Sequence, residues 1–320
     1  MNDAAPDEER LLDEAIDLMI SHQSDPDNAG IIDRIVAWRS MSDAHERIWN
    51  RVAKIHGASG RILSEKKRIE RRDALQTSRR NFMIGAAATV GTGATAYLFG
   101  PGLLLEARAD YLTGKGEFRR IELADGSVAI LGPQSALAVD FGEQQRTIRL
   151  LAGMTFLWVA PLPGAPLFVM AGPLRAASSS GAFDISSDGD YVTVGVDDGR
   201  VDLSSQRRQF SDDEELRQGD WLSFDASSGA IGRGRRERDM IGSWRDNLII
   251  AENEPVSALA LRIGRWIPGR IVIADPFIGS RYVSGVFDLD RPFSALEAAV
   301  HPANAKVRRI SSLLTIVSPV

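Results

Sequence analysis

The sequence predicts a multi-domain chain: a small all-α N-terminal domain, one transmembrane helix, an all-β sandwich or barrel-like domain, and a C-terminal α+β module of βαββαβ type. Apolar residues recur at helical spacing near the N-terminus, a run without charged residues follows, and an alternation of period two begins after it. The expected boundaries are 1–58 for the helical domain, 59–81 for a basic connector, 82–105 for the membrane helix, 108–226 for the β domain, 227–243 for a linker and 244–320 for the last module.

The first 58 residues are expected to form three short helices. The first runs from Leu11 to Ile20, the second from Ile31 to Arg39, and the third begins after Asp43, where Glu46 indicates a capping box. About 50 residues is near the lower limit for an independent core, which suggests that a partner completes this domain. The aligned apolar residues are Leu11, Leu12, Ala15, Leu18, Met19, Ile31, Ile35, Trp38, Ile48, Trp49, Val52 and Ile55.

The run from Asn81 to Leu105 contains no charged residue and exceeds the roughly 20 residues that a helix needs to cross a membrane. A basic segment precedes it, within a charged helix expected over about 61–80, so the positive-inside rule places the N-terminal side in the cytoplasm. The residues after the run are therefore expected to lie outside the cytoplasm. A buried helix of a soluble protein is the alternative.

Arg79 and Arg80 stand directly before this weakly apolar segment and resemble a twin-arginine export signal. A plain basic flank is the competing interpretation. Ala107-Arg108-Ala109 has the small residues of a cleavage site, although a retained anchor is expected here because a whole domain precedes the segment.

From about 108 to 226 the pattern is that of strands and hairpins. Asp125-Gly126 separates two alternating segments, and Asp188-Gly189 and Asp198-Gly199 are further turn candidates. The Gly- and Arg-rich residues 227–240 read as a linker. The last module is expected to contain strands at Leu248–Ile250, Ile271–Ile273, Val286–Phe287 and Leu313–Val317, and helices at Val256–Trp266 and Pro292–Val300.

Catalytic and metal chemistry find little support in the sequence. The 320 residues include no cysteine, which excludes disulfides and Cys-ligated zinc. Three of the four histidines lie before the uncharged run, leaving His301 alone after it, and the acidic runs lack the ligand spacing of a calcium loop. The net charge of -5 gives no argument for direct nucleic-acid binding. We therefore expect no enzyme, no metal and no cofactor.

Short motifs follow one another in order on both sides of the uncharged run. They are Trp38…His45…Trp49, then Leu123-Ala-Asp125-Gly126-Ser127, then Ser135-Ala-Leu137 with Arg149-Leu-Leu151-Ala-Gly153, then Trp244-Arg-Asp-Asn-Leu248, and finally Val283-Ser-Gly285-Val-Phe287. Their order and spacing resemble the FecR family, whose members are membrane-spanning regulators that pair with extracytoplasmic-function sigma factors. The chain departs from the family at Leu18, where Trp is usual, and at Ser180–Phe183, which replaces a G-T-x-F segment.

The resemblance implies a function and a set of partners. The helical domain would bind an extracytoplasmic-function sigma factor, and the outer domains would receive a signal from the N-terminal signalling domain of a TonB-dependent outer-membrane receptor, commonly in iron transport. A membrane protease would release the cytoplasmic part. The sigma-factor-binding residues would be Leu18, Ile35, Trp38, His45, Trp49 and Val52, and the receptor-side module would use Trp244, Gly285 and Phe287.

Two other functions stay open at this point. The β domain could bind a periplasmic ligand or serve as a structural module, with the helical part acting only as an anchor. An anchored metal-dependent hydrolase is the second, against which the sparse histidines argue.

Overall fold

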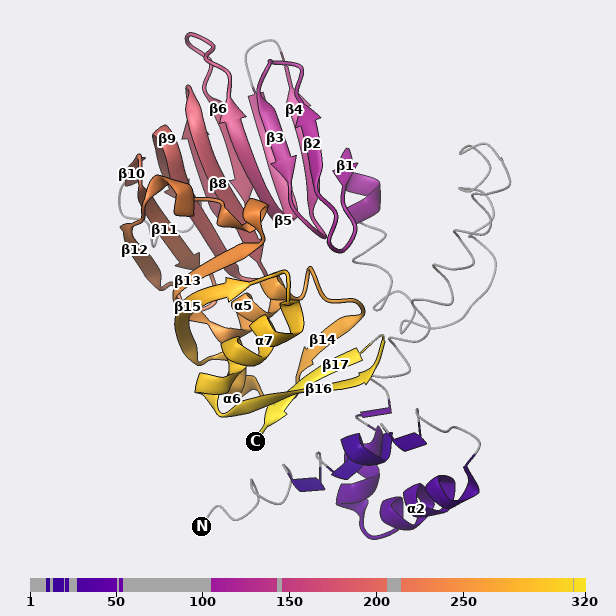
Figure 1. The fold of residues 1–320 in the computed structure, drawn as a ribbon. Helices are drawn as coiled ribbons and strands as arrows, with labels where there is room; N and C mark the ends of the chain where they lie inside the picture. The colour runs from indigo at the N-terminus through magenta and orange to yellow at the C-terminus, as the bar shows by residue number, and fades with distance from the viewer. Residues whose placement is uncertain are drawn as a thin grey trace, which may run out of the picture. The chain divides into compact units, whose positions relative to one another are not determined.

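The computed structural model describes residues 10–11, 14–19, 21–22, 28–50, 52–53, 105–142, 146–205, 214–312 and 314–320. Contacts between Cα atoms divide the chain into two units: residues 1–104 with 269–272 and 308–319, and residues 105–268 with 273–307 and 320. Figure 1 shows the large sheet of the second unit in magenta to orange.

The predicted membrane helix falls almost wholly on residues that lie outside this description. Residues 54–104 include the expected charged helix, the twin-arginine pair Arg79 and Arg80, and all but the last residue of the expected span. The helical turn 105–108 is described. Within the described ranges, no helix combines the length and apolar character that crossing a membrane requires.

Helix α2 (Ala29–Arg39) belongs to the N-terminal helical region. It begins at Asn28, whose side-chain oxygen accepts hydrogen bonds from the N–H groups of Gly30 and Ile31, which is the usual role of an N-cap residue. Residues 14–19 and 43–50 are also helical, as the sequence predicts. The predicted capping box at Asp43 is wrong, because the helix begins after Ser42, and the side chain of Glu46 turns instead to Arg39.

A twelve-stranded sheet makes up most of the second unit. Its strands are β1 (Tyr111–Leu112), β2 (Arg119–Glu122), β3 (Val128–Leu131), β4 (Ala136–Phe141), β5 (Arg146–Val159), β6 (Leu167–Ala171), β7 (Leu174–Ser178), β8 (Gly181–Asp188), β9 (Tyr191–Ser205), β10 (Glu214–Arg217), β11 (Asp220–Asp225) and β12 (Ile231–Arg235). The pairings β5–β6, β6–β7, β7–β9, β9–β8 and β8–β5 close a circuit, so this part is barrel-like. All the pairs in it are antiparallel except β5–β6.

The long strands β5 and β9 belong to both halves of the circuit. The first half of β5 pairs with β4 and β6, and its second half pairs with β3 and β8. It bends at Gly153, whose φ of 94° is readily available only to glycine. The interior holds the β domain's apolar core, with Phe183, Phe224 and Leu157 among its fully buried side chains.

The turns predicted at Asp125-Gly126 and Asp188-Gly189 are confirmed, since β2 pairs with β3 and β8 pairs with β9 across them. The turn predicted at Asp198-Gly199 is wrong. These residues lie inside β9, where the strand leaves β8 and joins β7 and β10, and Gly199 has a φ of 81°. Gly199, which suggests a turn in the sequence, instead allows the continuous strand β9 to bend.

The segment predicted as a linker, 227–243, contains strand β12, which pairs with β11, and the 3₁₀ helix η2 (Arg238–Met240). The 3₁₀ helix η3 (Ser243–Asp246) follows. Ile241 and Trp244 from this stretch pack with Met154, Phe156 and Ala182 on the β domain. This segment is therefore part of the packed structure.

Strands and helices alternate in the C-terminal part. Strands β13 (Leu248–Pro255) and β15 (Tyr282–Asp288) pair antiparallel, and α5 (Val256–Ile263) and α7 (Pro292–Val300) pack against them. A second sheet has the order β14 (Arg270–Ile273), β17 (Leu314–Pro319), β16 (Ala305–Ser311). Short helices α6 (Pro276–Gly279) and η4 (His301–Ala303) complete the part. The predicted α+β composition is confirmed, with β16 as an additional strand and the strands split between two sheets.

Candidate functional site

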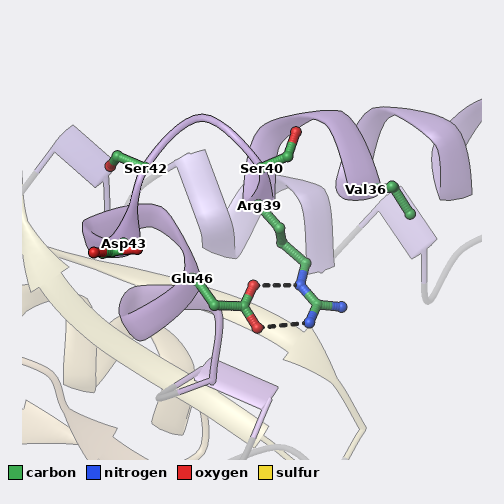
Figure 2. A pocket seen from close by; sticks show the side chains of 6 residues that line it. All are labelled: Val36, Arg39, Ser40, Ser42, Asp43 and Glu46. Carbon is green, nitrogen blue, oxygen red and sulfur yellow. Dashed lines mark hydrogen bonds and ion pairs between the residues drawn. The ribbon is translucent and has the colours of Figure 1, made fainter.

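An open hollow of about 540 Å³ lies on the surface of the helical region, between the end of α2 and the start of the next helix. Figure 2 shows Arg39 and Glu46 joined by two hydrogen bonds, while Val36 lies one turn back along α2. The hollow is lined by Val36, Arg39, Ser40, Ser42, Asp43 and Glu46.

Arg39 and Glu46 form a two-pronged ion pair that ties the two helices together. The Arg39 Nε and Nη2 atoms donate to the two carboxylate oxygens of Glu46 at 2.8 and 2.7 Å, and Asn50 Nδ2 donates to Glu46 at 3.1 Å. The hydrogen bond from Arg39 holds the pKa of Glu46 below its ordinary value. Because both side chains are about 40% exposed, the ion pair adds little to the free energy of unfolding. Its main effect is to hold the two helices in one relative orientation.

The residues predicted to bind a sigma factor lie mostly in the interior of the helical region. His45 is the partly exposed member, and its ring meets the Trp38 ring edge-on at a centroid distance of 4.6 Å. Trp38 also donates from Nε1 to Glu14 at 2.7 Å. Direct contact with a partner would require these buried side chains to become accessible, so their predicted role stays a prediction. The buried members are Leu18, Ile35, Trp38, Trp49 and Val52.

Exposed apolar side chains lie close in sequence to these predicted residues, and the sequence analysis did not identify them. Val36 is 59% exposed, Met41 is 67% exposed and Ile32 is 42% exposed. The spacing of Ile32 and Val36 by four residues puts them on one face of α2. This second apolar face of α2 could have predicted the exposed residues. It is short, however, and the longer apolar face that contains Ile35 and Trp38 dominates the helical periodicity.

The motif Leu123 to Ser127 of the β domain is a structural element. Leu123 is buried, and Gly126 occupies the turn with a φ of 83°. Asp125 accepts a hydrogen bond from the Ser127 backbone and pairs with Arg146 at 2.8 Å, with both charged side chains at most 6% exposed. Arg146 in turn donates to the Ala160 and Ala165 carbonyls. The motif thus fastens the β2–β3 turn to the start of β5.

The three predicted receptor-side residues are also held within the structure. Trp244 stacks on Phe118 at a centroid distance of 6.0 Å and donates from Nε1 to Asp184 at 2.6 Å. Phe287 is 6% exposed, and a Cβ at Gly285 would meet its ring at 3.2 Å. Gly285 therefore leaves room for the ring of Phe287, two residues further along the same strand β15.

A buried cluster of four charged residues was not foreseen from the sequence. Asp188, at the β8–β9 turn, accepts from Arg262 Nε at 2.8 Å and from Arg265 Nη2 at 2.6 Å. Glu254 on β13 pairs with Arg262 Nη1 at 3.0 Å. Burial raises the pKa of Glu254. The signal available in the sequence was the spacing of Arg262 and Arg265 among the apolar residues at the end of a helix.

Asp184 lies next to this cluster, partly exposed on β8. Desolvation raises its pKa to about 6, against the opposing effects of the Trp244 hydrogen bond and of the nearby arginines Arg262, Arg245 and Arg236. A half-open polar pocket of about 40 Å³ is lined by Asp184, Glu254 and Arg262, among others. Within the described part of the chain, no group of His, Asp and Glu side chains is arranged to hold a metal ion.

Residues 109–202 match the family model described as FecR protein. Two crystal structures, at 1.65 and 2.50 Å resolution, of a candidate anti-sigma factor from Parabacteroides distasonis ATCC 8503 have a similar fold, with a TM-score of 0.58 in each case. Each covers 66% of this chain and 98% of its own, at 17% identity, so the likeness concerns the fold. No curated protein matches the chain.

The matched region coincides with strands β1 to β9 and includes the Asp125–Arg146 pair and the bends in β5 and β9. This match confirms, for residues 109–202, the resemblance to the FecR family that the sequence motifs indicate.

Proposed function

We propose that this protein regulates an extracytoplasmic-function sigma factor, which it binds through the surface of its N-terminal helices. The FecR match over residues 109–202 carries this proposal, and a structural neighbour described as a candidate anti-sigma factor supports it. The chain itself acts as a binding protein in this account, with no catalytic step.

The surface around α2 has the properties of a small protein-binding site. Its exposed apolar side chains Ile32, Val36 and Met41 provide area whose burial favours association, at about 25 cal/mol per Å². Arg39 and Glu46 offer charged hydrogen-bonding groups beside them. An apolar centre with a polar border is the arrangement that protein interfaces commonly show. The buried residues, Trp38 among them, position this surface.

The membrane arrangement belongs to the same proposal. Residues 82–105 would cross the inner membrane once, so that the helical domain lies in the cytoplasm and residues from 108 onward lie in the periplasm. Arg79 and Arg80 would direct export. A membrane protease would then release the helical domain with its sigma factor.

The periplasmic signal would come from the signalling domain of a TonB-dependent outer-membrane receptor. Strand β15 lies in a two-stranded sheet and exposes Tyr282 and Val286, which are 48% and 66% exposed. A strand with one free edge can accept a partner strand, which is a common mode of peptide recognition. We propose this strand as the receptor contact, with Trp244, Gly285 and Phe287 supporting it.

The sigma-factor proposal is tested by affinity capture with the full-length chain. Wild-type protein and Val36→Asp are each used as bait, and captured proteins are quantified by mass spectrometry. We expect wild type to retain a sigma factor and Val36→Asp to retain at least tenfold less, because a charge buried in an apolar contact is costly. Arg34→Asp places the same residue at another exposed position of α2 and should capture as well as wild type.

If Val36→Asp and Arg34→Asp captured as much sigma factor as wild type, the chain would still bind a sigma factor, but through a surface other than that of α2. Absence of any sigma factor from correctly folded wild type would contradict the proposal and favour a membrane-anchored ligand-binding or structural protein.

A further inference from the structure

The buried charged residues Asp188, Glu254, Arg262 and Arg265, here named the sheet–lobe cluster, join two parts of the second unit. One part is the β domain. The other, here named the C-terminal lobe, consists of residues 248–268 and 273–300 and contains β13, α5, β15 and α7. Asp188 comes from the β domain, whereas the other three members come from the lobe.

Each part has an apolar core of its own. The β domain encloses a continuous cluster that includes Phe183 and Phe224. In the lobe, α5 packs on α7, and α7 packs on β15, which buries Leu259, Leu296 and Phe287. Each part therefore buries apolar side chains within itself.

The contacts between the two parts are largely polar. Besides the cluster itself, Lys115 Nζ donates to the carbonyls of Gly264 and Ile267 at 2.8 and 2.6 Å, and Arg236 pairs with Glu252 at 2.6 Å. An apolar contact is also present, since Trp266 packs beside the group that contains Met154 and Phe156. Interfaces of this polar kind commonly allow relative motion of the parts that they join.

The docked arrangement leaves polar groups unsatisfied at this boundary. Arg262 Nη2, Arg265 Nη1 and Trp266 Nε1 are buried and have no hydrogen-bond partner among the residues that the structure describes. The half-open pocket of about 40 Å³ lined by Asp184, Glu254 and Arg262 lies at the same boundary. If the boundary opened, water could form hydrogen bonds with these groups. These bonds would offset part of the free energy lost when the ion pairs separate.

Buried ion pairs are costly to form from hydrated charges, and their net stabilisation is small even where their geometry is good. They still enforce one orientation, because any displacement leaves a buried charge unpaired. We propose that the sheet–lobe cluster is a two-state joint, which holds the C-terminal lobe on the β domain in one orientation and can release it while both parts stay folded.

The test is amide hydrogen exchange on the purified full-length chain, which does not require a sigma factor or a receptor. Asp188→Asn removes the charge that both arginines share, and Arg265→Gln is a milder variant in which the Asp188–Arg262 pair remains. Asp190→Asn, an exposed acid two residues away, is the control. We expect amides of β13, α5 and β15 to exchange at least tenfold faster in both cluster variants, with the control unchanged.

Amides of β3 and of β5 should keep wild-type exchange in the same samples, since the joint opens without unfolding the sheet. Two results would overturn the proposal. Parallel acceleration of sheet and lobe in both variants would make the cluster part of one cooperative core, and unchanged exchange in both would show that the cluster does not hold the lobe.

Discussion

Asp184, like Glu254, is an acid whose charged form this fold disfavours. Its side chain lies under Trp244 and next to the sheet–lobe cluster, and desolvation raises its pKa to about 6. An unfolded aspartate titrates near pH 3.9. The folded protein therefore binds a proton more readily than the unfolded chain between these pH values. The resulting stabilisation is complete below the unfolded pKa and is lost as the pH rises through about 6.

Asp184→Asn should consequently stabilise the protein at pH 7.5, by about 1 kcal/mol, since the amide avoids the buried charge and its oxygen can still accept from Trp244. The advantage over wild type should shrink at pH 5, where wild-type Asp184 is largely protonated. Urea unfolding of the full-length chain at both pH values measures this. Asp140→Asn, on the exposed part of β4, is the control. A loss of stability at pH 7.5, or an equal difference at both pH values, would contradict the argument.

The ion pairs of single residues were the features that the sequence predicted least well. The charges of Asp125 and Arg146 are separated by twenty-one positions, and their pairing depends on the return of β5 to the β2–β3 turn. Asp188 reads as an ordinary turn residue, because nothing near it in the sequence indicates that Arg262 will reach it. Such contacts are properties of the tertiary fold, and local patterns do not contain them.

At the scale of elements, local patterns performed better. The end of α2, both ends of α7 and the hairpin turns at Asp125-Gly126 and Asp188-Gly189 lie where the sequence predicts them, whereas α2 begins at Ala29, two residues before its predicted start. The long strands β5 and β9 were not predicted, because a glycine that bends a strand has the same sequence signal as a glycine that ends one. Whether such a glycine bends the strand or ends it depends on the neighbouring strands with which the chain pairs.

Strand β15 offers a prediction at this scale. Val286→Asp should lower the affinity of the full-length chain for the signalling domain of its outer-membrane receptor at least tenfold, because Val286 is exposed on the strand that we assign to the contact. Ala298→Asp puts the same charge on the exposed surface of α7 and should bind like wild type. Titration followed by calorimetry measures both. Equal affinities would place the receptor contact elsewhere.

For the whole molecule, the sequence indicates the division into a helical and a β-rich part but says little about how the parts communicate. The second unit joins the β domain and the C-terminal lobe through polar contacts, and the first contains the α2 surface. A signal received at β15 would act on the lobe first, and the sheet–lobe cluster is where the lobe meets the β domain. The joint would therefore lie on the route from receptor contact to membrane segment.

The central claim is that the α2 surface binds a sigma factor, and site-specific photo-crosslinking in living cells tests it most directly. A photoreactive amino acid replaces Val36 in one full-length chain and Arg34 in another, and the adducts are identified by mass spectrometry. The account predicts a sigma-factor adduct from position 36 and little or none from position 34. A chain that is present at normal levels but gives no sigma-factor adduct at position 36, or equal adducts at both positions, would contradict it.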